Sequence, residues 1–164
     1  MRKKQKISKV KRIGTCLVAC IMIAAMTITS VPLFQTEVRA AGVSNPWDGS
    51  SREVPETDED GTYLIHNGAQ LAWFADQVNQ GKGSLNAVLC NDISLGGKYW
   101  TPIGKSADKT FSGTFDGQGH VIRGLYQDVE SDFTGLFGAV RGAGASVSHL
   151  TVSGNIKLGG RVTY

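Results

Sequence analysis

The sequence predicts a mainly β protein, a short right-handed parallel β-solenoid of the β-helix kind with an N-terminal capping α-helix. After Gly83 the chain consists of short apolar runs separated by Gly, Asp and Asn, and none of these runs is long enough for a helix. The pattern Phe-x-Gly-x-Phe occurs at residues 111–115 and again at 133–137, 22 positions later. An apolar pattern that recurs at a fixed spacing is typical of stacked coils that bury their faces against one another.

The phenylalanine pattern predicts which side chains lie in the core. Side chains alternate between the two faces of a strand, so Phe111, Gly113 and Phe115 share one face. Phe133 and Phe137 share a face in the same way in the second copy. The glycine between two rings leaves room for a neighbouring side chain to enter. We therefore expect the four phenylalanines to point inward.

Aliphatic residues give a second alignment. Ile122 and Leu125 recur as Val147 and Leu150 at an offset of 25 residues, with the three extra residues placed in the small-residue turn before Val147. A weaker match to the phenylalanine pattern lies upstream, where apolar residues at 89 and 93 precede the first copy by 22 positions. The order of aromatic pair, glycine turn and aliphatic pair is kept, which favours a repeated unit.

Residues 1–40 are typical of a signal peptide. A basic start precedes an apolar run at 13–31, Pro32 breaks the helix, and Val38 and Ala40 occupy the −3 and −1 positions of a cleavage site before Ala41. We expect cleavage after Ala40 and a protein that is secreted or displayed at the cell surface, with membrane contact only through the signal peptide before cleavage.

Two alternatives remain open for this segment. The apolar run is nearly long enough to be a retained membrane anchor. A lipoprotein is the other, because residues 17–20 resemble a lipobox that ends at Cys20. Removal of the signal peptide would leave Cys90 as the single cysteine, within a strand-like run, where we expect it to act as a small buried apolar residue.

Charge excludes one class of partner. Residues 1–40 hold eight of the 17 Lys and Arg residues and one of the 14 acids. The rest of the chain therefore carries nine basic and 13 acidic residues, although the whole chain has a net charge of +3. The basic surplus belongs to the export segment, so nothing in the remaining chain predicts nucleic-acid binding.

Residues 41–60 are polar, contain two prolines and end in acids, which predicts a flexible linker. Asp58 and Asp60 before Gly61 suggest a calcium loop, but the bidentate acid required at the twelfth position is replaced by Asn67. We therefore interpret these acids as solvated charge.

The region 61–164 is expected to be the β-solenoid, with its capping helix at 68–80. Asn67 can cap this helix, with Gln70 at capping-box spacing, and Gly81 suits the left-handed residue that ends it. Four apolar residues fall at i, i+3, i+4 and i+7, which forms one stripe. They are Leu71, Phe74, Ala75 and Val78.

Four segments together resemble the N-terminal region of bacterial cell-surface proteins with GLUG-type repeats. They begin at Tyr63, Asn91, Phe111 and Phe133, and the last contains the Gly-Leu-x-Gly element at 135–138. The resemblance covers about residues 62–158. It implies a solenoid module of a large exported protein from a Gram-positive-type bacterium. Similar repeats occur in some immunoglobulin-A-cleaving zinc peptidases, whose activity lies in a separate zinc domain.

One group of side chains raises the question of catalysis. Asp116, His120 and Arg123 come close together in sequence, and β-helix enzymes that act on polysaccharides use acids and bases on one face. Asp116 opens a glycine-rich turn, however, where its carboxylate can accept backbone N–H bonds. His66 and His149 lie in separate segments, and no carboxylate pair, phosphate loop or metal-ligand spacing is present. We therefore predict no catalytic, cofactor-binding or metal-binding residues.

Two functions from different classes follow. The first is a non-catalytic cell-surface or adhesion scaffold, whose ligand could be a host glycoprotein, a polysaccharide or the cell wall. The second is the N-terminal non-catalytic region of a surface hydrolase whose catalytic domain follows Tyr164. No helix or polar cap closes the final strand-like run, so we expect the natural protein to continue past Tyr164 with further repeats.

Overall fold

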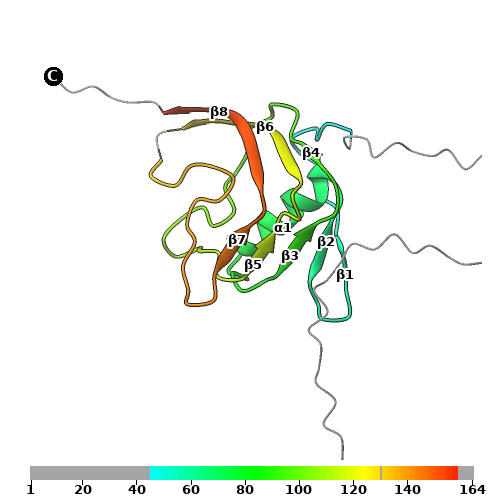
Figure 1. Ribbon diagram of the computed structural model, residues 1–164. Helices are drawn as coiled ribbons and strands as arrows, with labels where there is room; N and C mark the ends of the chain where they lie inside the picture. Colours follow the sequence, from blue (N-terminus) through cyan, green and yellow to red (C-terminus); the bar gives the residue numbers. More distant parts are fainter. Residues whose placement is uncertain (1–44, 130, 159–164) are drawn as a thin grey trace, which may run out of the picture.

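The computed structural model describes residues 45–129 and 131–158, which form two small sheets and one helix (Figure 1). Along the chain the elements are β1 (Glu56–Thr57), β2 (Tyr63–Ile65), α1 (Gly68–Asn79), β3 (Ala87–Leu89), β4 (Ile93–Ser94), β5 (Thr114–Asp116), β6 (Val121–Val129), β7 (Ser146–Ser148) and β8 (Thr151–Leu158).

The chain alternates between the two sheets. One sheet has the strand order β1-β2-β3-β5-β7, and the other has the order β4-β6-β8. All neighbours are parallel except β1, which pairs antiparallel with β2. After β3, β5 and β7 the chain passes through a short turn into the other sheet. Parallel neighbours require long connections, and these are the glycine-rich segments between the short strands.

The structure corrects the predicted fold class. It is a mixed α/β arrangement of parallel-stranded sheets with one short helix, and the expected β-solenoid with a 22-residue repeat is wrong. Phe115 lies opposite Val147, 32 positions later, rather than opposite Phe137. Ile122 lies opposite Val152, 30 positions later, rather than opposite Val147.

The physical reason for this correction is the uneven length of the strands and connections. Strands range from two residues in β4 to nine in β6, so the spacing between neighbours is not constant. The second phenylalanine pattern is not a strand, because Gly135 has a φ of +113° and turns the chain between Phe133 and Phe137. Phe137 instead forms an isolated bridge with Ile103.

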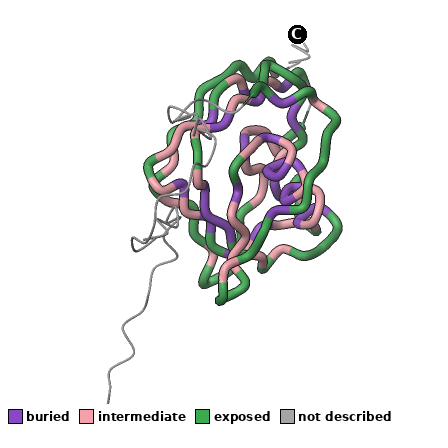
Figure 2. The backbone as a smooth tube through the Cα atoms, turned by 90° about the vertical axis from the view of Figure 1, so that its right-hand side faces the viewer, coloured by how far each residue is buried: buried purple, intermediate pink, exposed green. Residues whose placement is uncertain are grey.

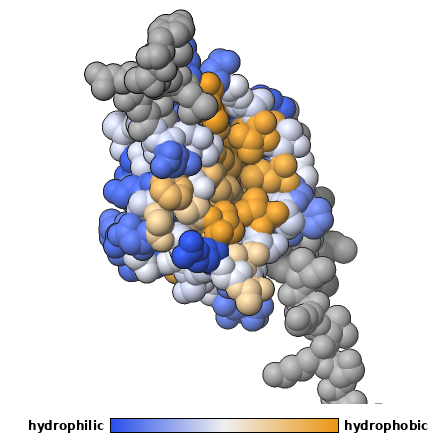
Figure 3. All heavy atoms as spheres, turned by 90° about the vertical axis from the view of Figure 1, so that its left-hand side faces the viewer, coloured by the Kyte–Doolittle hydropathy of each residue, from blue (hydrophilic) through white to orange (hydrophobic). Residues whose placement is uncertain are grey.

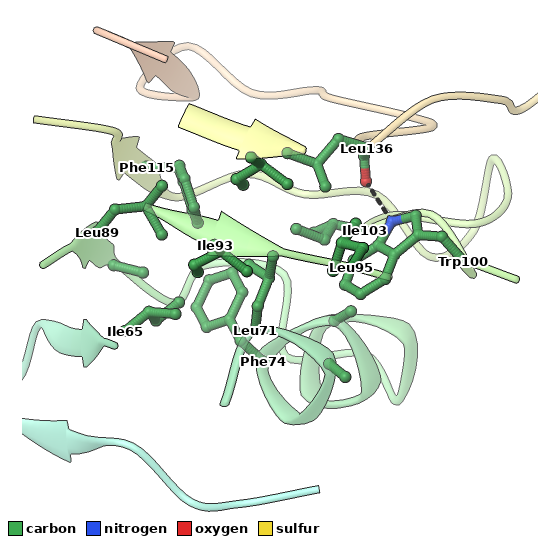
Figure 4. Packing of buried hydrophobic residues seen from close by; sticks show 14 of the residues in the cluster. Ile65, Leu71, Phe74, Leu89, Ile93, Leu95, Trp100, Ile103, Phe115 and Leu136 are labelled. Carbon is green, nitrogen blue, oxygen red and sulfur yellow. Dashed lines mark hydrogen bonds between the residues drawn. The ribbon is translucent and has the colours of Figure 1, made fainter. Parts of the chain in front are cut away.

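The core lies between the two sheets and α1, as the buried residues in Figure 2 and the close view in Figure 4 show. Phe111 and Phe115 are fully buried, as predicted, and Phe137 packs against both with ring centroids 5.2 Å away. Phe133 is only half-buried. The largest fully buried side chains are Trp100, Phe74, Phe111, Phe115, Ile65, Leu71, Leu89, Ile93, Leu95, Ile103, Ile122 and Gln127.

Helix α1 forms as the sequence predicts. The Asn67 side chain accepts a hydrogen bond from the Gln70 backbone N–H at 2.9 Å, and the Gln70 side chain accepts one from the His66 N–H at 2.7 Å. Gly81 follows the helix with a φ of +102°. All four residues of the apolar stripe are buried, and Phe74 contacts Phe111 and Phe115. The helix therefore supplies part of the core.

The segment expected to be a linker packs on this core over its described part, residues 45–60. Trp47 is 5% exposed, and its ring meets that of Trp100 edge-on at 5.7 Å. The Glu53 carboxylate accepts hydrogen bonds from the side chains of Asn67 and Gln70. These contacts join the segment to the start of α1. The polar composition predicted a flexible segment rather than a packed one, because composition does not show the large area that a single tryptophan can bury.

The expected signal peptide and its cleavage site lie outside the described residues. Within the described ranges, α1 has 12 residues and no helix has the length and hydropathy needed to cross a bilayer.

Candidate functional site

Two aspartate–histidine pairs lie where the chain passes from one sheet to the other. Asp92 sits between β3 and β4, and His120 directly precedes β6. Asp116 ends β5, and His149 lies between β7 and β8. In each case the aspartate lies at one such crossing and the histidine at the next crossing along the chain.

Asp92 connects the β3–β4 turn to the beginning of β6. One carboxylate oxygen lies 3.2 Å from His120 Nδ1 and accepts the Val121 backbone N–H at 3.0 Å. The other oxygen accepts Arg123 Nη1 at 3.0 Å. His120 and Asp92 are each about one-third exposed at the side chain. The cluster is thus accessible to solvent, and three partners hold the carboxylate in place.

These contacts lower the pKa of Asp92 below its usual range. The largest cause is the hydrogen bond from the Val121 N–H, followed among the lowering effects by the Arg123 guanidinium and the His120 ring, while burial acts in the opposite direction. Donors that point at a carboxylate favour its charged form. Asp92 is therefore a stable anion, suited to holding cations and N–H groups rather than to donating a proton.

Asp116 forms the second cluster. Its Oδ1 accepts the Gln118 backbone N–H at 2.9 Å, which confirms the predicted role in the glycine-rich turn. The same oxygen lies 3.0 Å from His149 Nδ1. Gln118 Nε2 donates to the other oxygen at 3.2 Å, and both Gln118 and His149 have positive φ values, of 53° and 49°. The carboxylate thus stabilises two turns with unusual backbone conformations.

The structure separates the three residues that the sequence placed together. His120 and Arg123 do share a carboxylate, but it belongs to Asp92. Sequence reasoning missed Asp92 because it used an offset of 22 residues. Ile93 lies opposite Ile122, an offset of 29, and this register brings Asp92 to the start of β6.

A shallow groove of about 340 Å³ lies over the outer surface of the five-stranded sheet. Thr114 and Asp116 of β5 lie opposite Ser146 and Ser148 of β7, and these side chains point away from the core because Phe115 points into it. Gln118 also lines the groove. Six of the nine lining residues therefore carry hydroxyl, amide or carboxylate groups, and the other three are Ala87, Val88 and Phe115.

A smaller hollow of about 180 Å³ lies beside the N-terminal segment. Arg52 pairs with Asp76 at 2.6 Å and lies 5.3 Å from the centre of the Trp47 ring. Tyr99, which is half exposed, forms part of the wall. The cation here already has a carboxylate and an aromatic partner, so it attaches the segment to α1.

No other arrangement in the described part of the chain suggests metal chemistry. The Asp58 carboxylate accepts the N–H groups of Asp60 and Thr62 and so shapes the hairpin between β1 and β2. Within residues 45–129 and 131–158, no three His, Cys, Asp or Glu side chains are grouped to hold a metal ion. Cys90 follows β3 and is half-buried, which differs from the full burial expected of it.

Comparison of the chain with protein-family models, with curated proteins and with solved structures found no match in any of the three.

Proposed function

We propose that this chain is a non-catalytic module of an exported bacterial protein, secreted or displayed at the cell surface, where it serves as a scaffold or adhesion unit. The signal-like segment 1–40 and the resemblance to GLUG-type repeats support export. The structure supports the scaffold role through the way in which its titratable side chains are used.

The observation that carries the proposal is that both Asp–His pairs connect successive strands. Asp92 holds the N–H of Val121 and the guanidinium of Arg123, and Asp116 holds the N–H of Gln118. A general base needs a lone pair directed at a substrate position. Each of these carboxylates instead directs its oxygens at donors of the protein itself, in β6 for Asp92 and in the turn after β5 for Asp116.

The groove over β5 and β7 is the surface that best fits a ligand of the expected kind. A saccharide presents many hydroxyl groups, which pair with side-chain hydroxyls, amides and carboxylates. Ser146, Ser148, Gln118 and Asp116 provide these groups on one rigid sheet surface. We therefore assign a polysaccharide or the glycan of a glycoprotein as the ligand class.

Binding of the secreted form to purified cell-wall polysaccharides and to glycosylated host proteins tests this proposal. Ser148→Arg fills the groove and should abolish binding, whereas Ser84→Arg, at an exposed position outside the groove, should leave binding unchanged. Binding that survives Ser148→Arg would reject the groove. Hydrolysis of any of these polymers by the purified chain would reject the non-catalytic role, and a lack of binding to all of them would reject adhesion.

A further inference from the structure

Apolar side chains lie exposed on the last strand of each sheet and on the loop beside them. Figure 3 shows an apolar area on the side of the molecule that bears residues 131–150 in Figure 1. Val140, Val147, Val152 and Ile156 are 39–46% exposed, whereas most valine and isoleucine side chains of a small domain are buried. We call this surface, with the outer edges of β7 and β8, the open end.

Each of these residues occupies an inward-facing position. The residue opposite each one on the neighbouring strand or bridge is completely buried. These pairs are Val140 with Phe111, Val147 with Phe115, Val152 with Ile122, and Ile156 with Gln127. The four side chains are therefore exposed because no strand follows β7 and β8 in the described part of the chain, not because their positions suit a surface.

The strand edges at this end lack the usual protection. Natural edge strands carry charges, prolines or bulges that prevent pairing with another chain. Residues 142–156 include no Lys, Arg, Asp or Glu. Seven residues of β8, Thr151 to Lys157, are exposed. Lys157, near the end of β8, is the one charged side chain in the described residues of β7 and β8, so most of the outer N–H and C=O groups of these strands can pair with a similar strand.

The opposite end of both sheets is protected. The five-stranded sheet ends in β1, which is two residues long, antiparallel, preceded by Pro55 and followed by three acids. The three-stranded sheet ends in β4, where the Trp47 N–H donates to the Ser94 carbonyl at 2.9 Å. A short, acidic strand and an occupied carbonyl both oppose the addition of another strand.

We propose that the open end binds the open end of a second copy of this chain. Stacking of the open end on the opposite end would place neutral β7 against the acidic and proline-blocked β1, which opposes growth of a filament. Strand β7 and the part of β8 before Lys157 carry no charge, so these edges of two copies match each other. The partner is therefore a second copy related by a two-fold axis, a relation that brings each strand antiparallel to itself and closes at two subunits.

The mass of the secreted form in sedimentation, measured over a series of concentrations, tests the proposal. We expect twice the chain mass at high concentration and the single chain mass on dilution. Val147→Lys and Val152→Lys place a charge on each edge strand at a position already 39% exposed, so each should keep the fold and abolish the dimer. Val54→Lys changes a valine that is 65% exposed outside this surface and should leave the dimer intact.

Hydrogen exchange keeps the proposal testable if the lysine variants fail to fold. In the native chain the amides of β8 should become more protected as concentration rises, and those of α1 should not change. A monomer at every concentration would overturn the proposal. So would a dimer that persists in folded Val147→Lys and Val152→Lys, a mass that grows beyond two chains, or β8 protection that does not depend on concentration.

Discussion

Gln127 and Gly135 hold each other through two hydrogen bonds. The Gly135 N–H donates to Gln127 Oε1 at 2.7 Å, and Gln127 Nε2 donates to the Gly135 carbonyl at 3.1 Å and to the Trp100 carbonyl at 3.0 Å. Gln127 is fully buried although it is polar. Its amide therefore replaces the strand pairing that the turn at Gly135 prevents.

Gln127→Leu keeps a similar side-chain volume and removes every one of these bonds. The Gly135 N–H and the two carbonyls would lose a partner, and a buried unsatisfied group costs about 1–3 kcal/mol. We expect a large drop in the free energy of unfolding, measured in urea. The control is Gln77→Leu, at a half-buried position of α1. Its free energy of unfolding should be close to that of the native chain. Equal stability of both variants would show that the Gln127 amide is dispensable.

Phe115→Ala should destabilise the fold more than Phe137→Ala. Phe115 is fully buried and meets Phe74 and Phe137, so its truncation should cost about 3–5 kcal/mol. Phe137 is only half-buried, so Phe137→Ala should cost less. Thermal melting of both variants measures the difference. A larger loss for Phe137→Ala would contradict the assigned burial.

Gly113→Ala tests why glycine is needed between two phenylalanines. A Cβ at this position would lie 2.0 Å from the Leu85 carbonyl oxygen, which belongs to the backbone and cannot rotate away. We expect a severe loss of stability or of folded yield. Gly144→Ala is the matched control, because a Cβ there meets no atom within 4 Å. A stable Gly113→Ala protein would mean that the two segments are farther apart.

Asp92→Asn should reduce stability in a pH-dependent way. The folded-state pKa of Asp92 is lowered, so its carboxylate stabilises the fold above the unfolded pKa of about 3.9, and this contribution disappears as pH falls through the lower folded value. The difference in melting temperature between native and variant proteins should thus be present at pH 7 and vanish in strong acid. Exposed Asp132→Asn should show little difference at either pH. A difference for Asp92→Asn that stays constant with pH would contradict the assigned cause.

Export with cleavage between Ala40 and Ala41 predicts a single N-terminus for the secreted protein. Intact mass and N-terminal sequencing of protein from the medium measure it. A product that begins with a lipidated Cys20, or a chain that retains residues 1–40 in the membrane fraction, would support one of the two alternatives instead.

Local signals in the sequence determined local structure. The Asn67 cap, the apolar stripe and Gly81 predicted α1 nearly to the residue, because capping and helical periodicity depend on neighbours within a few positions. The glycine-rich turn at Asp116 was predicted for the same reason. Burial of Phe111 and Phe115 followed from strand alternation.

Only the tertiary structure decided the register between distant strands. The sequence suggested 22 residues, but Ile93 pairs with Ile122 and Phe115 with Val147, so the spacing differs from strand to strand. Connections of variable length leave no fixed period for a sequence comparison to find. This register places Asp92 beside His120 and leaves Val147 exposed above a buried phenylalanine. A carboxylate finds its partners, and an edge strand becomes exposed, only once the strands are stacked.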